Sequence, residues 1–347
     1  MKLNVVSHVD GTAWDEQVRA LGGTVFHCSA WADYIMAGGQ NATPQYITLV
    51  SDDDRPVGTA LGFATRSTCK VLSWFTARLW FDTMPVLADD AQEALPEFLE
   101  RIEDHAQRTG NVELTIGSYA APPTAAELAG AGFELTKYWE FVLDLTQTED
   151  DLWTAMEHKR RKNIRKARRS NVIIREMARE EGLRHLRRLQ GDSSQRIVAR
   201  GGPDIRYNGR HEADPVNILL DSGVGQLIGA EVEGEVVSAS LFTCFNGLAY
   251  HTLSGHNRKA LSVQAPTLLL WEMIMRCRRE GVMKFNLGGC SADAQNEDSP
   301  EHGVYQYKKA FGGELAECKN VSKVLRPGTR FFVKLLRRMA GYGGMGG

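Results

Sequence analysis

GVMKFNLGGCSADAQNEDSPEHGVYQYKKAFGG, residues 281–313, is the stretch on which the fold prediction rests. Apolar and polar residues alternate over 282–287, which predicts a strand with one buried face. Gly288 and Gly289 follow at once, where the backbone can turn sharply and a ligand can come close. The next dozen residues are polar and predict a surface loop, and residues 304–311 predict a short helix that stops at glycine. This order predicts the rim of a binding site.

A second interpretation of the same stretch stays open. It reads residues 281–313 as an ordinary strand-to-helix connection with a solvated loop, in which Lys308 and Lys309 only stabilise the carboxyl end of a helix. Loops often carry function, but most do not. The pattern alone therefore does not choose between a binding site and a plain connection.

The remaining pattern alternates strands and helices, which predicts an α/β (α+β) fold. Residues 46–50 and 57–64 predict a hairpin, 91–107 an amphipathic helix, and 140–145 a strand. Three further strands are predicted at 225–231, 236–245 and 248–254, and Asn246-Gly247 is typical of a type I′ hairpin turn. A helix over 265–280 follows. A chain of 347 residues is long enough for two domains.

One helix, predicted over residues 152–169, is strongly basic. Its sequence LWTAMEHKRRKNIRKARR carries eight Lys or Arg residues after Glu157, with no acidic residue among them to form i,i+4 pairs. Like charges at this spacing repel, so the segment predicts an anionic partner, with phosphates as the first candidates. The alternative is a plain exposed basic helix.

The totals exclude several classes of protein. A net charge of −2 gives no overall attraction to nucleic acid or membrane, so such a contact needs a local patch. The six cysteines are scattered without a CxxC pair, which argues against a zinc site or a disulfide framework. No apolar run reaches the ~20 residues of a membrane-spanning helix. We expect a soluble cytoplasmic protein with reduced thiols and no metal.

Two motifs resemble those of a known family. FNLGG followed by YKKAFGGE is similar to the "dlGG … FKxxFGge" signature of the Fem-type aminoacyltransferases, and LWTAMEHKRRKNIRKARR resembles their "LWxxmxxKxRxxIRKA" run. That family builds peptidoglycan cross-bridges from aminoacyl-tRNA with two GNAT-like acyltransferase domains. The resemblance covers residues from about 138 to 313 well and the first 135 residues only loosely. Tyr307 stands where the family pattern has Phe.

The resemblance implies two tandem GNAT-like domains, each a mixed central sheet flanked by helices. Residues 1–150 would form the first domain and 151–316 the second, which begins with the basic helix. Residues 317–347 would pack back on the first domain through a strand and a helix over 330–339. The long charged helical hairpin of staphylococcal Fem enzymes has no counterpart in this sequence, which leaves the acceptor open.

The resemblance also implies an aminoacyl group arriving on tRNA, without another cofactor. GNAT enzymes hold acyl-CoA with a glycine-rich turn before a helix, whereas residues 258–266 contain no glycine and Pro266 lacks a donor. The acceptor would be an amine of a murein precursor or of a small molecule. The predicted catalytic residues are Lys308 and Tyr250. The predicted binding residues are Lys159, Arg161, Asn163, Arg165, Lys166, Arg258, Asn286, Gly288 and Gly289.

Two other functions remain as alternatives. One is an N-acyltransferase that uses acyl-CoA in cell-envelope or polysaccharide modification. The other is an RNA-binding module without catalysis. Smaller choices also stay open: residues 196–211 could close over a substrate or form a surface insertion, and the helix over 330–339 could touch a membrane surface or pack on the first domain.

Overall fold

A computed structural model describes the chain except for residues 40, 68–73, 121–131, 200–213, 327 and 329–347. The sequence also predicts a helix that begins at Pro122-Pro123 and runs to Leu128. This helix, most of the loop over 196–211 and the helix over 330–339 lie outside the described residues. The chain divides into two compact units, Met1–Thr136 with Cys318–Gly347, and Lys137–Glu317. The first division falls at Thr136, ahead of the boundary that the sequence places at residue 150. The mixed α/β fold is confirmed.

The first unit is built on a mixed sheet. Neighbouring strands follow the order β1-β2-β3-β4-β6-β13, and β5 pairs with β3. The pairs are antiparallel except for β4 and β6, which run parallel. The strands are β1 (Lys2–Val6), β2 (Ala42–Val50), β3 (Pro56–Thr65), β4 (Arg78–Phe81), β5 (Val86–Leu87), β6 (Glu113–Ile116) and β13 (Glu314–Val324), whose last residues pair with β6.

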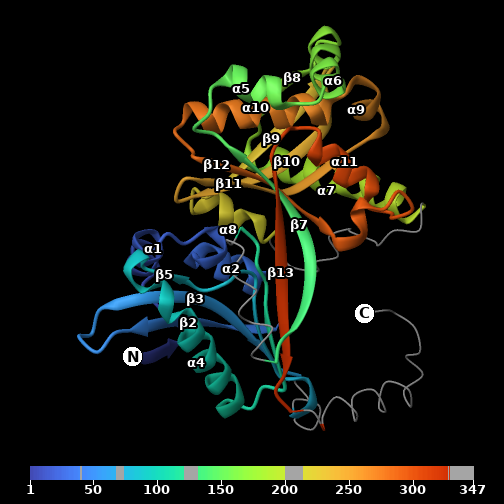
Figure 1. Cartoon of the computed structure of the whole chain (residues 1–347). Coiled ribbons are helices and arrows are strands. Elements are labelled where there is room, and N and C mark those ends of the chain that lie inside the picture. The colour runs from blue at the N-terminus through green and yellow to red at the C-terminus, as the bar shows by residue number, and fades with distance from the viewer. Residues whose placement is uncertain (40, 68–73, 121–131, 200–213, 327, 329–347) are drawn as a thin grey trace, which may run out of the picture. The chain divides into compact units, whose positions relative to one another are not determined.

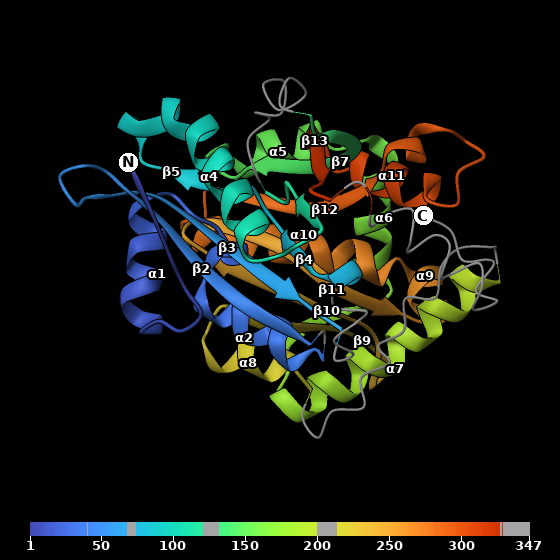
Figure 2. The same cartoon turned by 90° about the horizontal axis from the view of Figure 1, so that it is seen from below.

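Helices cover both faces of this sheet (Figure 2). On one face, Phe98 and Ile102 of α4 belong to the same buried core as Ile47 and Leu49 of β2. On the other face, Trp14 of α1 meets Tyr46 edge to face, with ring centroids 4.9 Å apart. Alternate residues of β2 therefore point to opposite helices, as the period of a strand requires. The helical elements are α1 (Gly11–Ala20), η1 (Val25–His27), α2 (Ser29–Ala37), η2 (Asp89–Ala94) and α4 (Leu95–Arg108).

The second unit has its own run of strands, in the order β7-β12-β11-β10-β9-β8. The predicted meander is confirmed: β9, β10 and β11 are antiparallel neighbours. Both turns of the meander have two residues at positive φ, with Asn246 at 51° and Gly247 at 75° in the second, as a type I′ turn requires. The strands are β7 (Glu134–Asp144), β8 (Ile173–Glu176), β9 (Gly225–Val232), β10 (Glu235–Phe245), β11 (Leu248–His256) and β12 (Lys284–Ser291).

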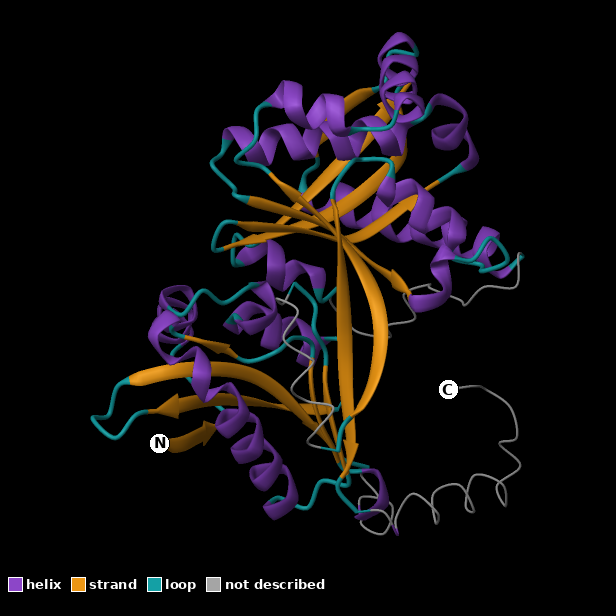
Figure 3. Cartoon of the chain, in the orientation of Figure 1, coloured by secondary structure: helices purple, strands orange, loops and turns teal. Residues whose placement is uncertain are grey.

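Two long helices cover the two faces of these strands, and Figure 3 shows the strands between helical layers. In Figure 1, α10 lies on one side and α7 on the other. The core on the α10 side includes Leu269, Trp271, Phe242 and Phe285. The helices are α5 (Glu149–Ala155), α6 (His158–Arg169), α7 (Arg179–Val198), α8 (Val216–Asp221), α9 (Arg258–Val263), α10 (Ala265–Arg279) and α11 (His302–Lys309), with the short η4 (Ala292–Gln295).

One local expectation was wrong. The pair Gly288-Gly289 does not end its strand, because β12 continues to Ser291. Within the described part of the chain, no helix combines the length and the apolar character that crossing a membrane would take.

Candidate functional site

The site is centred on Lys308 in the last turn of α11, and the residues around Lys308 explain why the segment YKKAFGG holds it there. Tyr305 and Phe311 are buried in the core on either side of Lys308. Gly312 has φ 82°, and a Cβ at this position would come within 2.5 Å of the Ala155 carbonyl oxygen. Only glycine allows both the left-handed backbone and this close approach. The predicted helix stop at glycine is therefore confirmed, and it anchors α11 against the end of α5.

The side chain of Lys308 points at the glycine pair of β12. Its Nζ donates to the carbonyl oxygen of Gly289 at 2.7 Å. A Cβ at Gly288 would lie 3.3 Å from this Nζ and 3.5 Å from the carbonyl oxygen of His251. Burial lowers the pKa of Lys308 to about 8, although Cys290, Glu140 and Glu301 act in the opposite direction. The ammonium is thus largely withdrawn from water and close to losing its proton at physiological pH.

A buried carboxylate supports the strand opposite Lys308. Glu140 of β7 is 1% exposed. Its two oxygens accept hydrogen bonds from the hydroxyl of Tyr250 and the side-chain amide of Asn286, each at 2.8 Å. Asn286 Oδ1 in turn accepts the backbone N–H of Gly288 at 2.8 Å. Tyr250, Asn286 and Gly288, all predicted from the sequence, therefore meet through a residue that the prediction did not include.

The same place carries a bulge. Asn286 of β12 pairs with Val142 of β7, and Gly289 pairs with Glu140, so β12 has one extra residue between the two pairs. Gly288 supplies the positive φ of 78° that this geometry needs. β11 and β12 run parallel, and their pairing ends at Tyr250 and Asn286, just before the bulge. The bulge changes the direction of the β12 backbone beside Lys308. The sequence predicted a turn at this glycine pair.

The basic helix α6 is joined to α11 by its one buried cation. Arg160 is 8% exposed and donates to the Tyr307 carbonyl oxygen at 3.0 Å and to the Thr267 hydroxyl at 3.2 Å. Its guanidinium also lies over the rings of Tyr307 and Phe311, at 4.3 and 5.0 Å from their centroids. Burial lowers the pKa of Arg160. Arg160 therefore fixes α6 relative to the residue that precedes Lys308.

The opposite side of α6 is a row of cations. Residues at i, i+3, i+7 and i+10 of a helix share one side, and here all four are exposed Lys or Arg: Lys159, Lys162, Lys166 and Arg169. In the part of the chain that the structure describes, none of the four forms an ion pair. We call this row the cation stripe. It faces away from Ile164 and Ala167, which are buried.

Two of the predicted phosphate-binding residues are engaged elsewhere. Arg161 donates to the carbonyl oxygens of Trp153 and Thr154 at the end of α5, the second at 2.8 Å, where a cation is favoured. Arg165 lies 5.3 Å from the ring centroid of Trp153. Asn163 is half-buried on the same helix. Lys159 and Lys166 belong to the cation stripe.

Arg258 is exposed in the first turn of α9, and none of the described contacts links it to Lys308. The connection from α9 to α10 passes through Gln264 at φ 63°. The backbone N–H groups of Thr267 and Leu268 both bond to the Gln264 carbonyl oxygen, and Pro266 has no N–H. The beginning of α10 therefore offers few donors for a pyrophosphate.

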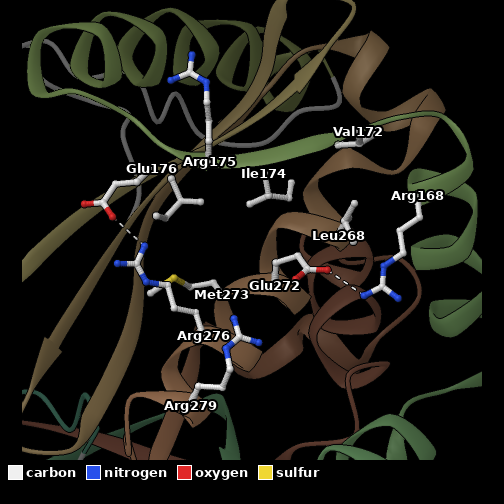
Figure 4. Close-up of a pocket in the computed structure, with 11 residues that line it drawn as sticks. Arg168, Val172, Ile174, Arg175, Glu176, Leu268, Glu272, Met273, Arg276 and Arg279 are labelled. Atoms are coloured by element: carbon white, nitrogen blue, oxygen red, sulfur yellow. Dashed lines mark hydrogen bonds and ion pairs between the residues drawn. The ribbon is translucent and has the colours of Figure 1, made fainter.

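A separate pocket of about 330 Å³ opens beside α10 (Figure 4). Val172, Ile174, Leu268 and Met273 line it together with charged residues. Those charges are mostly internally compensated, as Figure 4 shows: Arg168 pairs with Glu272 at 2.9 Å, and Arg276 pairs with Glu176 at 2.8 Å. Paired arginines attract an external anion weakly, so this pocket adds little to the site.

Sequence reasoning missed three residues of the site and its surroundings. Glu140 is an acidic residue inside the apolar strand segment EFVLDL, and that position was the available signal. Lys162 and Arg169 would have been found by placing the basic residues on a helical wheel. No cluster of three or more His, Cys, Asp or Glu side chains able to hold a metal occurs among the residues described.

A family model and a solved structure both show similarity to Fem-type proteins. The model of the FemAB family matches residues 125–198 and 225–319. The crystal structure of FemX is similar with a TM-score of 0.75 and 14% identity, over 98% of this chain and 99% of FemX.

More distant similarity links the fold to two other structures. A domain of a putative lysylphosphatidylglycerol synthetase from Agrobacterium fabrum has a TM-score of 0.58 and 13% identity, over 94% and 97% of the two chains. A tandem GNAT protein from the clavulanic acid biosynthesis pathway has a TM-score of 0.53 and 12% identity, over 93% and 99%. These likenesses show a tandem GNAT fold. No curated protein matches the sequence.

Proposed function

The chain belongs to the FemAB family and is an acyltransferase, and we propose that it transfers an aminoacyl group from tRNA to an amine acceptor, forming an amide. The observation that carries the proposal is the cation stripe on α6, whose helix is tied by Arg160 to the residue before Lys308. A polyanion held on the stripe would thus be fixed relative to the candidate catalytic lysine.

The cation stripe suits a phosphate backbone better than a single small anion. From Lys159 to Arg169 is ten residues, or about 15 Å along a helix, which exceeds the size of one phosphate group. Since the four cations lack ion-pair partners in the described chain, they have no internal interaction to give up on binding. Cations that neutralise successive phosphates release counterions, which makes binding strong at low salt and weak at high salt.

The reaction needs no covalent intermediate with the enzyme. The neutral amine attacks the ester carbonyl of the aminoacyl-tRNA, the C–N bond forms and the C–O bond to the ribose breaks. The proton lost by the amine ends on the ribose hydroxyl that leaves. Lys308, held by the Gly289 carbonyl, would stabilise the negative oxygen of the tetrahedral intermediate. In the same proposal Tyr250 acts indirectly, because its hydroxyl donates to Glu140.

An acyl-CoA donor is the alternative, and the connection from α9 to α10 argues against it. A pyrophosphate site at a helix start needs free N–H groups. Here the first residues of α10 include Pro266, and Thr267 and Leu268 donate to Gln264. In this proposal the acceptor is an amine of a murein precursor or of a small molecule.

A filter-binding assay with bulk tRNA, between about 50 and 200 mM salt, tests the cation stripe directly. The test variant is Lys159→Gln/Lys162→Gln/Lys166→Gln. The control removes three other exposed cations of the same unit, Arg184→Gln/Arg279→Gln/Lys284→Gln. We expect wild type and control to bind alike, while the stripe variant loses affinity and its salt slope falls by about 2 to 3, close to one per phosphate contact. Equal slopes in the two variants would refute the role of the stripe.

A further inference from the structure

Glu140 and Lys308 are both fixed to the glycine pair of β12. In the register of β7 and β12, Glu140 lies directly opposite Gly289, and the carbonyl oxygen of Gly289 accepts the hydrogen bond from Lys308 Nζ at 2.7 Å. A Cβ at Gly288 would lie 3.3 Å from that Nζ and 3.8 Å from Cε1 of Tyr250. The hydroxyl of Tyr250 donates to Glu140. The same two residues of β12 therefore connect the ammonium with the carboxylate.

The hydrogen bonds of Glu140 are those of an ionised carboxylate. Its oxygens accept from the Tyr250 hydroxyl and from the Asn286 amide, each at 2.8 Å. The backbone N–H of Gly288 fixes the orientation of this amide, because it donates to Asn286 Oδ1. Donors that reach both oxygens stabilise the charged form. Since Glu140 is 1% exposed, water screens its charge only weakly.

Three acidic groups act on the ammonium of Lys308. Burial lowers its pKa to about 8, and Cys290, Glu140 and Glu301 act in the opposite direction. Cys290 is a neutral thiol at this pH, because burial raises its own pKa to about 11. Glu301 is partly exposed, so water screens its charge. His251 of β11 is neutral as well, since burial and Lys308 lower its pKa to about 3. Among these groups, Glu140 is therefore the one that is both charged and deeply buried.

The charge of Lys308 depends on such a group. An ammonium that is withdrawn from water loses its proton easily unless an opposite charge lies near it. Without that charge, the same burial would lower the pKa of Lys308 further, and the side chain would be largely neutral at physiological pH. A neutral amine carries no charge with which to stabilise an oxyanion.

We propose that Glu140 is a positioning residue for Lys308. Its buried negative charge keeps Lys308 in the ammonium form, and its hydrogen bonds, through Asn286, hold the bulge whose Gly289 carbonyl orients that ammonium. Glu140 acts only through Lys308 and does not touch the substrate. The consequence for oxyanion stabilisation rests on the proposed function, whereas the effect on the protonation of Lys308 does not.

Nuclear magnetic resonance of protein with isotope-labelled lysine measures the protonation of Lys308 directly, and Lys308→Arg identifies its signal. Glu140→Gln and Glu140→Met remove the charge of Glu140, whereas Glu140→Asp keeps it. Glu301→Gln is the matched control, because it removes a partly exposed carboxylate that acts on the same ammonium. Thermal melting shows which variants fold, and either of the two charge-free variants is sufficient for the test.

We expect the pKa of Lys308 to fall from about 8 to about 7 or below in the charge-free variants, because a nearby opposite charge raises the pKa of a lysine by about one unit or more. Glu140→Asp should keep most of the wild-type value, and Glu301→Gln should change it less than Glu140→Gln does. An unchanged pKa of Lys308 in a folded charge-free variant would overturn the proposal. A larger change in Glu301→Gln than in Glu140→Gln would overturn it as well.

The pH dependence of acyl transfer distinguishes this role from a purely structural one. The ratio of kcat in Glu140→Gln to kcat in the wild type should rise about fivefold from about pH 8.5 to about pH 6.5, because acid restores the ammonium. A structural defect would leave this ratio constant, which would overturn the proposal. If the resonance result holds but no transfer from tRNA is found, the proposed donor fails and the effect of Glu140 on Lys308 stands. If only the resonance result fails, the donor is unaffected.

Discussion

At the scale of single residues, the side chain of Lys308 is largely buried and lies beside the backbone of Gly288 and Gly289. A side chain that stabilises an oxyanion must be protonated, and burial lowers the pKa of Lys308 to about 8. The structure therefore predicts an alkaline limb in the pH profile of the acyl transfer. That limb would not follow from an ordinary exposed lysine, whose pKa is near 10.4.

We predict that Lys308→Ala lowers kcat by about 10² to 10³, the usual effect of losing one oxyanion donor. Lys309→Ala, which removes the exposed neighbouring cation, should change kcat little. In the wild type, activity should fall as the pH rises through about 8, because the neutral amine of Lys308 carries no charge. Steady-state kinetics over pH measures both effects. An unchanged alkaline limb in Lys308→Arg would show that another group titrates.

The same pKa has a consequence for stability. Between about pH 8 and 10.5 the unfolded chain keeps the Lys308 proton and the folded chain has lost it, so the free energy of unfolding rises with pH. Lys308→Met has no such group and should lack this rise. Urea unfolding of both proteins across this range measures the difference. Parallel curves would contradict the assigned burial of the lysine.

Glu140 supports the site from beneath, and its removal is predicted to act on stability first. In Glu140→Gln an amide N–H₂ would face the hydroxyl of Tyr250 or the amide of Asn286, leaving a buried donor unpaired. We expect a loss of roughly 2 to 4 kcal/mol in the free energy of unfolding, measured by urea denaturation. Glu297→Gln, at an exposed loop position, is the control and should be neutral. If Glu140→Gln left the free energy of unfolding unchanged, the hydrogen bonds of Glu140 would not stabilise the site.

At the scale of elements, a comparison of two glycines distinguishes the effect of backbone strain from the effect of the β12 bulge on catalysis. Gly288 and Gly234 both have positive φ, 78° and 76°, but only at Gly288 does a new Cβ meet other atoms, including Lys308 Nζ. Each Gly→Ala change should destabilise the protein by about 1 to 2 kcal/mol, because alanine resists the left-handed region. Only Gly288→Ala should also reduce kcat. Equal kcat in both variants would remove the bulge from the catalytic account.

The elements differ in how well the sequence predicts them. The hairpin turn at Asn246-Gly247 was predictable because it depends on two residues that adopt positive φ locally. The role of Gly288 was not, because a bulge and a turn use the same residue and only pairing with β7 distinguishes them. Burial of Arg160 likewise depends on Thr267 and Tyr307, which are distant in sequence. Local signals predict elements, whereas contacts between elements decide which side chains form the site.

At the scale of the whole molecule, motif order was enough to predict the family and the α/β fold. Lys308 and the glycine pair lie where the motif suggested, because strand, loop and helix are consecutive there. The residues at which the chain divides into units were harder to predict. The first division of the chain falls at Thr136, inside β7, where no composition shift marks it. The charge pattern of α6 predicted an anionic partner, and a helical wheel groups the four cations on one side, while the burial of Ile164 and Ala167 shows which side of the helix faces the core.

The central claim is that the acyl donor is aminoacyl-tRNA. The most direct test incubates the protein with bulk tRNA charged with radiolabelled amino acids, using n-butylamine and a UDP-linked muramyl pentapeptide as separate acceptors. The account predicts that label moves from tRNA to an amide product with one of them, and that RNase treatment or Lys308→Ala abolishes this transfer. If label stays on the tRNA with both acceptors, while acetyl-CoA supports acylation that RNase does not affect, the account is contradicted.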